Sequence, residues 1–297
     1  MMPLKREAGI RDLGYNETEP VILIIRQCGI IDTTMRMETA NSQSSLKRMI
    51  SVLDLIEQSS GGLSFDQMLE TLKLTRSTLY RYVKILSEAG LVTSLPELGY
   101  TLGPRVAELD YRMRSQDPLI VASIPVMSEL ARTVPGVALL CRRYRDKVLC
   151  VHQEGSSEAF SSGYERGRDR PLLQGAASRI ILAHMPARAI SRLFGERQEE
   201  FAQAGLGDTL ERVRAALAQI RQAGWVASEG QVTAGVTGIA APVFDNRGAV
   251  VGSLSITVGK TAMKDEDIAP LAERVKFCAA IVSNAISRAP AMQVANG

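Results

Sequence analysis

The residues best suited to a chemical role lie between Lys73 and Lys84, a stretch with hydroxyl and basic side chains and no Asp or Glu. If the stretch is a helix, its polar side chains recur at i, i+3, i+4 and i+7: Ser77, Tyr80, Arg81 and Lys84. Its apolar side chains recur on the opposite side: Leu79, Val83 and Leu86. Such a helix packs through one face and presents donors and positive charge on the other, which suits the major groove of DNA. Nucleic acid is therefore the first partner to consider.

The flanking sequence predicts the elements that would hold this helix. Helices are expected over 46–58, 65–72 and 76–89, followed by two short strands in 91–102. Ser64 and Gln67 form a capping box for the second helix. Thr75 is the expected N-cap of the third helix, and Gly90 ends it. The expected inward side chains of the first helix are Leu46, Ile50 and Leu53, with Ile56 or Leu55 as a further candidate. Three helices and a hairpin are the parts of a winged helix-turn-helix.

The rest of the chain predicts a second domain of mixed helices and strands. Gly103-Pro104 and Asp117-Pro118 bracket a connecting helix. Further helices are expected at 118–133, 175–185, 187–204, 209–223 and 265–287. Strands are expected at 137–141, 147–153, 225–228, 238–244 and 249–258, with one more in the Gly-rich stretch 154–173. This order favours an α+β domain with one antiparallel sheet.

Composition narrows the function classes. A chain of 297 residues suggests two domains, and a net charge of +3 means that DNA contacts must come from local clustering of basic residues. The four cysteines are separated and form no CxxC: Cys28, Cys141, Cys150 and Cys278. His152 and His184 are interpreted as structural, so no metal site, disulfide framework or cofactor is expected. No apolar run reaches the roughly 18 residues of a membrane span, and a cytoplasmic protein without a signal peptide is expected.

The chain resembles the IclR-type family of bacterial transcriptional regulators over residues 45–288. The segments that carry the resemblance are SLKRMISVLDLI at 45–56, STLYRYVKILSEAGLV at 77–92, GYTLGPRVAEL at 99–109, IRQAGW at 220–225, GVTGIAAPVFD at 235–245 and GSLSIT at 252–257. The resemblance implies an N-terminal winged helix-turn-helix, a linker helix and a C-terminal GAF-like effector-binding domain. It also implies homodimers or dimers of dimers on a palindromic double-stranded operator, controlled by a small organic acid.

The predicted domain boundaries follow from the Gly103-Pro104 and Asp117-Pro118 breaks together with the family resemblance. They are a flexible leader at 1–44, the winged helix-turn-helix at 45–103, the linker helix at 104–117, the effector-binding domain at 118–288 and a tail at 289–297. An architectural DNA-binding protein without a ligand is one alternative. A hydrolase is another, although the chain has no Gly-x-Ser-x-Gly and neither histidine lies in a catalytic motif.

The predicted DNA contacts centre on the third helix. Arg81 is expected to read guanine, and Arg76 and Lys84 to contact phosphates. The other candidates, which could reach bases or the backbone, are Arg48, Ser77, Thr78, Tyr80 and Tyr100. Tyr100, at the end of the wing, could reach the minor groove or simply pack. The alternative for the whole set is a solvated helix face, which also collects basic residues.

The predicted effector site begins at a helix start of small residues, where free backbone N–H groups could hold a carboxylate: Gly175, Ala176, Ala177 and Ser178. The family pocket adds Ser228, Glu229, Val236, Gly238, Ser255 and Thr257. Ser255 and Thr257 alternate along one strand, so their hydroxyls should share a face. Small residues and strand hydroxyls also occur simply to allow close packing, and that alternative stays open.

Three departures from the family pattern concern the ligand. Ala176-Ala-Ser-Arg179 stands where the family often has Ala-Leu-Gly-Lys, Ser228-Glu229 replaces two acids, and Gly238 replaces Cys or Ser. Few fixed charges remain apart from Glu229 and Arg179. We therefore expect a ligand bulkier than a short keto acid, such as an aromatic acid.

Overall fold

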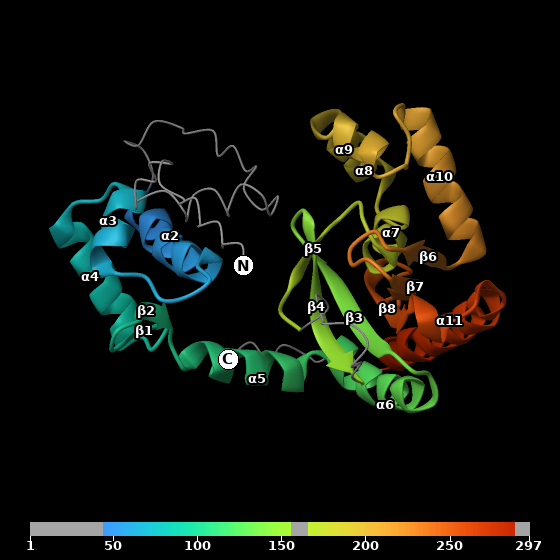
Figure 1. Cartoon of the computed structure of the whole chain (residues 1–297), viewed down its shortest axis with the longest axis horizontal. Helices are drawn as coiled ribbons and strands as arrows, with labels where there is room; N and C mark the ends of the chain where they lie inside the picture. The colour runs from blue at the N-terminus through green and yellow to red at the C-terminus, as the bar shows by residue number, and fades with distance from the viewer. Residues whose placement is uncertain (1–43, 156–165, 289–297) are drawn as a thin grey trace, which may run out of the picture. The chain divides into compact units, whose positions relative to one another are not determined.

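The computed structural model describes residues 44–155 and 166–288, and the chain divides into two compact units between Pro104 and Arg105 (Figure 1). Except for Ser44, the leader expected at 1–44 lies outside the described residues, as does the tail expected at 289–297. In the part of the chain that the structure describes, no helix combines the length and apolar character needed to cross a membrane.

The first unit has the predicted helices and hairpin. They are α2 (Ser45–Gln58), α3 (Phe65–Leu72), α4 (Arg76–Glu88), β1 (Val92–Leu95) and β2 (Gly99–Leu102). The capping box of Ser64 and Gln67 is present, and the Thr75 hydroxyl accepts a hydrogen bond from the Thr78 N–H at 3.3 Å. Gly90 has φ 72° and allows the Leu91 N–H to reach back to the Leu86 carbonyl at 2.9 Å. The local end signals of these helices are therefore confirmed.

The core of the first unit corrects part of the expected inward face of α2. Leu46 and Ile50 are 68% and 49% exposed, whereas the candidate Ile56 is buried, as is Val52, which was not expected to be. The apolar residues of α2 occupy more than one stripe, because Met49, Leu53 and Leu55 also pack partly against the core. Sequence spacing alone could not choose among these stripes. The position of α2 on α3 and α4 decides which one is buried.

The second unit contains one six-stranded sheet in the order β5-β4-β3-β8-β7-β6. The strands are β3 (Val137–Tyr144), β4 (Lys147–Glu154), β5 (Asp169–Pro171), β6 (Val226–Glu229), β7 (Val236–Phe244) and β8 (Val250–Gly259). Every neighbouring pair is antiparallel, as predicted. The register of β3 against β4 shifts between Leu140 and Cys141, so that Cys141 lies opposite Cys150.

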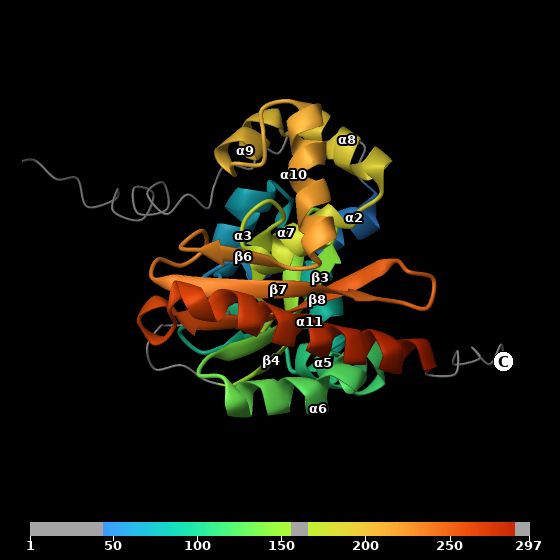
Figure 2. The same cartoon turned by 90° about the vertical axis from the view of Figure 1, so that its right-hand side faces the viewer.

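Helices cover both faces of this sheet (Figure 2). One face packs on α7 (Ala176–Ala183), with α8 (Ala187–Glu196), α9 (Gln198–Gln203) and α10 (Leu210–Ala223) beyond it. The other face packs on α6 (Pro118–Thr133) and α11 (Asp265–Arg288). The alternation along β3 separates the two cores, since Leu139 belongs to the α7 side and Leu140 to the α6 side. The result is a three-layer α+β domain.

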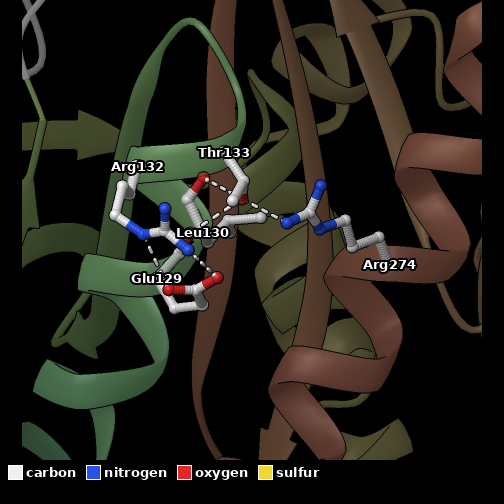
Figure 3. A network of polar contacts seen from close by, with 5 residues as sticks. All are labelled: Glu129, Leu130, Arg132, Thr133 and Arg274. Carbon is white, nitrogen blue, oxygen red and sulfur yellow. Dashed lines mark hydrogen bonds and ion pairs between the residues drawn. The ribbon is translucent and has the colours of Figure 1, made fainter.

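A polar network joins the end of α6 to α11 (Figure 3). Arg132 donates hydrogen bonds of 3.0 and 2.8 Å to the Glu129 carboxylate and holds the pKa of that carboxyl below its ordinary value. Arg274 of α11 donates to the Thr133 hydroxyl, which itself donates to the Glu129 carbonyl at 2.7 Å. Exposed ion pairs add little to stability, because water and salt screen them. The network therefore orients these helices more than it stabilises them.

The helix expected to be the linker, α5 (Arg105–Gln116), groups with the second unit. Its Arg114 lies 2.9 Å from the Nδ1 atom of His152 on β4, and its Asp110 forms an ion pair with Arg166. No residue of α5 is fully buried. This helix is thus attached to the second unit through polar contacts and leaves much of its surface exposed.

Candidate functional site

The outer face of α4 carries the predicted DNA-reading residues. The helix buries one side in the core of the first unit, through Leu79, Tyr82, Val83 and Leu86. This packing leaves the opposite side exposed: Ser77, Tyr80, Arg81 and Lys84. Tyr80 is 65% exposed although it is a large aromatic residue. The structure therefore assembles a surface of hydroxyls and cations on one helix face.

Two cations on this surface already have acidic neighbours. Arg76 lies 3.2 Å from Asp66, with both side chains more than 70% exposed, and its guanidinium is 5.4 Å from the Phe65 ring centroid. Lys84 lies 3.9 Å from Glu88. Such exposed pairs contribute at most about 1 kcal/mol, so a phosphate can replace the carboxylate.

Two predicted DNA contacts, Thr78 and Tyr100, are engaged elsewhere, and a third, Arg48, is less exposed than the α4 face. The Thr78 hydroxyl is 2.8 Å from the Thr75 hydroxyl, within the helix cap. Arg48 is half-buried on α2. The Tyr100 ring packs on Phe65 with 6.5 Å between centroids, which favours packing over a minor-groove contact. The compact reading surface is therefore Ser77, Tyr80, Arg81 and Lys84, with Arg76 at its edge.

The second unit contains a small cavity of about 30 Å³ between α7 and the sheet. Its lining residues are Leu139, Cys141, Cys150, Arg170, Gln174, Gly175, Ala176, Ala177, Ser178, Ser228, Val232, Gly238, Ser255 and Thr257. Each predicted effector residue except Glu229 and Val236 is among them. A volume of this size holds about two water molecules. The cavity is therefore present at the predicted place but nearly closed.

The start of α7 forms the polar wall of the cavity. Gly175 donates its N–H to the Gln231 side chain at 3.1 Å, and Ala176 donates to the Ser228 hydroxyl at 2.8 Å. The Ala177 and Ser178 amides have no acceptor in the described part of the chain. Helix N-termini with free amides attract anions. Two of the four predicted small residues thus keep the donors that a carboxylate needs, and Ser228 acts as a cap.

The charged groups near the cavity differ from those expected. Glu229 forms an exposed ion pair with Lys260 outside the cavity. Arg179 donates to the Leu173 carbonyl at 3.2 Å and to the Ala204 carbonyl, so it holds the backbone. The cation in the lining is Arg170 of β5, which was not among the predicted residues. No periodicity marks a strand of three residues, so no sequence signal identified it.

Other residues predicted for the effector site pack in the core or already have a protein partner. Val236 is 2% exposed and belongs to the core on the α7 side of the sheet. The Ser255 hydroxyl donates to the Leu139 carbonyl at 3.4 Å, so it already has a protein partner. A Cβ atom at Gly238 would lie 3.6 Å from the Ser228 hydroxyl and 3.7 Å from the Ala176 Cβ. Gly238 therefore leaves room for about one methyl group, not for a bulky ligand.

Comparison with known families matches both units. The model of the IclR helix-turn-helix domain matches residues 45–96, and that of the bacterial transcriptional regulator IclR C-terminal domain matches residues 112–284. The glycerol operon regulatory protein of Streptomyces griseus is 28% identical over 253 residues, which cover 82% of this chain and 96% of that protein. BhcR, an HTH-type transcriptional regulator of Paracoccus denitrificans, is 25% identical over 240 residues, or 80% of this chain and 85% of that protein.

Solved structures share the fold. A transcriptional regulator from Alicyclobacillus acidocaldarius superposes with a TM-score of 0.68 at 22% identity, covering 82% of this chain and 99% of the other. An IclR homologue from Microbacterium hydrocarbonoxydans, solved in complex with 4-hydroxybenzoate, has a TM-score of 0.66 at 23% identity. It also covers 82% of this chain and 99% of the other.

Proposed function

Because this chain belongs to the IclR family of bacterial transcriptional regulators, we propose that it binds a specific operator through α4 and that a small organic acid in the α7 cavity controls that binding. The observation that best supports operator binding is the outward face of α4. The four side chains at the i, i+3, i+4 and i+7 positions are exposed together, while the opposite face is buried. In this proposal the protein binds DNA and a small acid and catalyses no reaction.

The residues of the α4 face take different roles in this proposal. Arg81 makes a bidentate contact to guanine, which is the commonest base-specific contact of arginine. Lys84 and Arg76, at the two ends of the surface, neutralise phosphates and contribute equally on any sequence. Ser77 and Tyr80 add hydrogen bonds to base edges or phosphates. Specificity therefore depends on Arg81, and salt-dependent affinity on the other cations.

The cavity supports an organic acid as the effector class. Arg170 supplies a cation, and the Ala177 and Ser178 amides supply donors at the positive end of a helix dipole. The relative solved with 4-hydroxybenzoate makes an aromatic acid a suitable first probe. Ligand pockets usually enclose about 300–1,000 Å³, so binding of such an acid has to enlarge the cavity. The effector therefore selects a more open arrangement of α7 on the sheet, and this shift is the proposed signal.

Operator binding is tested by an anisotropy titration, in which the protein is added to DNA from the region that flanks the gene encoding it. Arg81→Ala is expected to weaken binding by about 1–3 kcal/mol, concentrated at one base position. The matched control is Arg212→Ala, because Arg212 is an exposed arginine of the second unit that pairs with Asp208. An Arg81→Ala protein with unchanged affinity and base preference would disprove the reading role.

The same titration, repeated with benzoate, 4-hydroxybenzoate and pyruvate, tests the effector half. An effective acid shifts operator affinity in the parent protein, and Arg170→Gln weakens that response about tenfold or more through loss of a charged hydrogen bond. Glu229→Gln is the control, since Glu229 lies outside the cavity. Operator binding that ignores a broad set of acids would favour an architectural protein without a ligand.

A further inference from the structure

Two cysteines face each other in the wall of the cavity. Cys141 of β3 lies directly opposite Cys150 of β4, just after the register shift that follows Leu140. Both side chains line the cavity and therefore lie on the same face of the sheet. Both are free thiols and buried. Their positions in the sequence do not suggest a pair, and the proposed function makes no use of them.

The backbone hydrogen bonds define how close the two strands run at this point. The Cys150 N–H donates to the Arg168 carbonyl at 3.2 Å, and the Cys150 carbonyl accepts from the Gly167 N–H at 2.9 Å. Both groups thus point away from β3, so Cys141 and Cys150 form a non-hydrogen-bonded pair. This is the closer kind of antiparallel pair, with Cα atoms about 4.5 Å apart. Disulfides span Cα distances of about 4.4–6.8 Å, so the two sulfurs can bond with little backbone movement.

Both sulfurs lie near one cation of the cavity wall, Arg170. The contact with Cys141 lowers the pKa of Cys150 against the opposing effect of burial, and Arg170 acts in the same direction. The same contact and burial raise the pKa of Cys141, and Arg170 opposes that shift. The Cys150 thiol also donates a hydrogen bond to the His152 carbonyl at 3.4 Å. The thiolate is the reactive form of cysteine, and the cation favours it in this pair.

The size of the cavity restricts what can reach the sulfurs. Its volume of about 30 Å³ accommodates molecules close to water in size. The lining includes exposed Gln174 and half-buried Val232, which place one side of the cavity at the protein surface. Hydrogen peroxide fits this space, whereas bulky thiol reagents do not.

We propose that Cys141 and Cys150 form an oxidative modification site, at which hydrogen peroxide converts the two thiols into one disulfide. The Cys150 thiolate attacks one peroxide oxygen and the O–O bond breaks. Cys150 becomes a sulfenic acid, and the leaving hydroxide takes up the proton that Cys150 had lost, giving water. The Cys141 sulfur then attacks the Cys150 sulfur, the S–O bond breaks, and the second hydroxide leaves as water with the Cys141 proton. Two thiols and one peroxide give one disulfide and two waters.

The test uses the full chain with Cys28→Ser and Cys278→Ser, so that only the pair remains. One equivalent of hydrogen peroxide is added to the native protein, which is then alkylated after denaturation and mapped by mass spectrometry. The expected product has lost two hydrogens, contains a Cys141–Cys150 cross-linked peptide and recovers both thiols on reduction with dithiothreitol. The unsubstituted chain is mapped in parallel, so the result does not depend on the folding of a variant.

Single substitutions trap the intermediate. Cys141→Ser is expected to accumulate a sulfenic acid on Cys150 that dimedone traps, because no second thiol remains to resolve it. Cys150→Ser is expected to give no intramolecular disulfide, for the same reason. Absence of the cross-linked peptide in the unsubstituted chain would overturn the proposal. Neither readout involves DNA or an organic acid, so this proposal can fail independently of the proposed function.

Discussion

Two glycines in the cavity wall have different reasons to be glycine. Gly175, the residue before α7, has φ 81° and ψ 155°, a region that only glycine adopts readily. A Cβ atom there would also lie 2.9 Å from the Val232 side chain. Gly238, on β7, has no unusual φ and only ordinary contacts around its missing Cβ. The first glycine is required by the backbone, and the second only leaves space.

This difference predicts unequal effects of the same substitution. Gly175→Ala should lower the free energy of unfolding by about 1–3 kcal/mol, because alanine is strained at this φ and ψ. Gly238→Ala should change it by less than about 1 kcal/mol, since the added methyl meets neighbours at normal distances. Urea denaturation of the two variants and the parent measures both values. Equal stabilities of the two variants would contradict the backbone argument.

At the scale of elements, His152 connects β4 to α5. Its Nδ1 lies 2.9 Å from the Arg114 guanidinium, and its Nε2 lies 2.9 Å from the Glu154 carboxylate. Arginine has only donors, so Nδ1 accepts and the ring proton is on Nε2, which donates to Glu154. Burial lowers the pKa of His152, although Glu154 opposes the shift. The neutral ring is therefore the form that holds α5 to the sheet.

The lowered pKa predicts acid sensitivity. Between the folded value and the unfolded value of about 6.5, the unfolded chain binds a proton that the folded chain does not. The free energy of unfolding thus rises with pH through this window and falls on acidification below about 6.5. His152→Gln keeps one acceptor and a donor without titrating, so its stability should fall less than that of the parent on acidification.

Urea denaturation at several pH values measures this difference. His184→Gln is a useful companion, because burial also lowers the pKa of His184, which contacts α7 and not α5. Each substitution should remove the contribution of its own histidine to the slope of the free energy of unfolding against pH. Parallel pH profiles for the parent and His152→Gln would exclude the proposed role of His152.

At the scale of the whole molecule, α5 has apolar side chains that the described part of the chain leaves exposed. Val106, Leu109 and Met113 recur at i, i+3 and i+7 and are 36%, 48% and 51% exposed. A stripe at this spacing is typical of a helix that packs on another helix. Helix-turn-helix proteins bind paired half-sites about 34 Å apart as symmetric dimers. We propose that this α5 stripe contacts α5 of a second copy.

Charge on the stripe should prevent the proposed contact between two copies. The double variant Leu109→Glu, Met113→Glu is expected to scatter light with the mass of one chain, because two unpaired carboxylates cannot be buried at a helix contact. Arg112→Glu is the control, since it changes charge on the same helix outside the stripe. Continued dimerisation of the double variant would show that another surface joins the copies.

Much of the fold could be predicted from the sequence because the relevant signals are local. Helix ends depend on caps such as Ser64, Thr75 and Gly90, which act within one turn. The reading face of α4 follows from the 3.6-residue period. The longer strands were predictable by alternation, and the antiparallel pairing of β3 with β4 and of β7 with β8 by the short turns between them.

Tertiary structure decided what depends on contacts distant in the sequence. The buried stripe of α2 was decided by its neighbours, because Val52 and Ile56 compete with Leu46 and Ile50 for the core. The cavity brings Arg170 of a three-residue strand beside the start of α7, which no periodicity encodes. One register shift after Leu140 places Cys141 opposite Cys150. Local sequence thus determined the elements and the α4 surface, whereas strand register and packing determined the cavity and its chemistry, since these depend on all the strands and helices together.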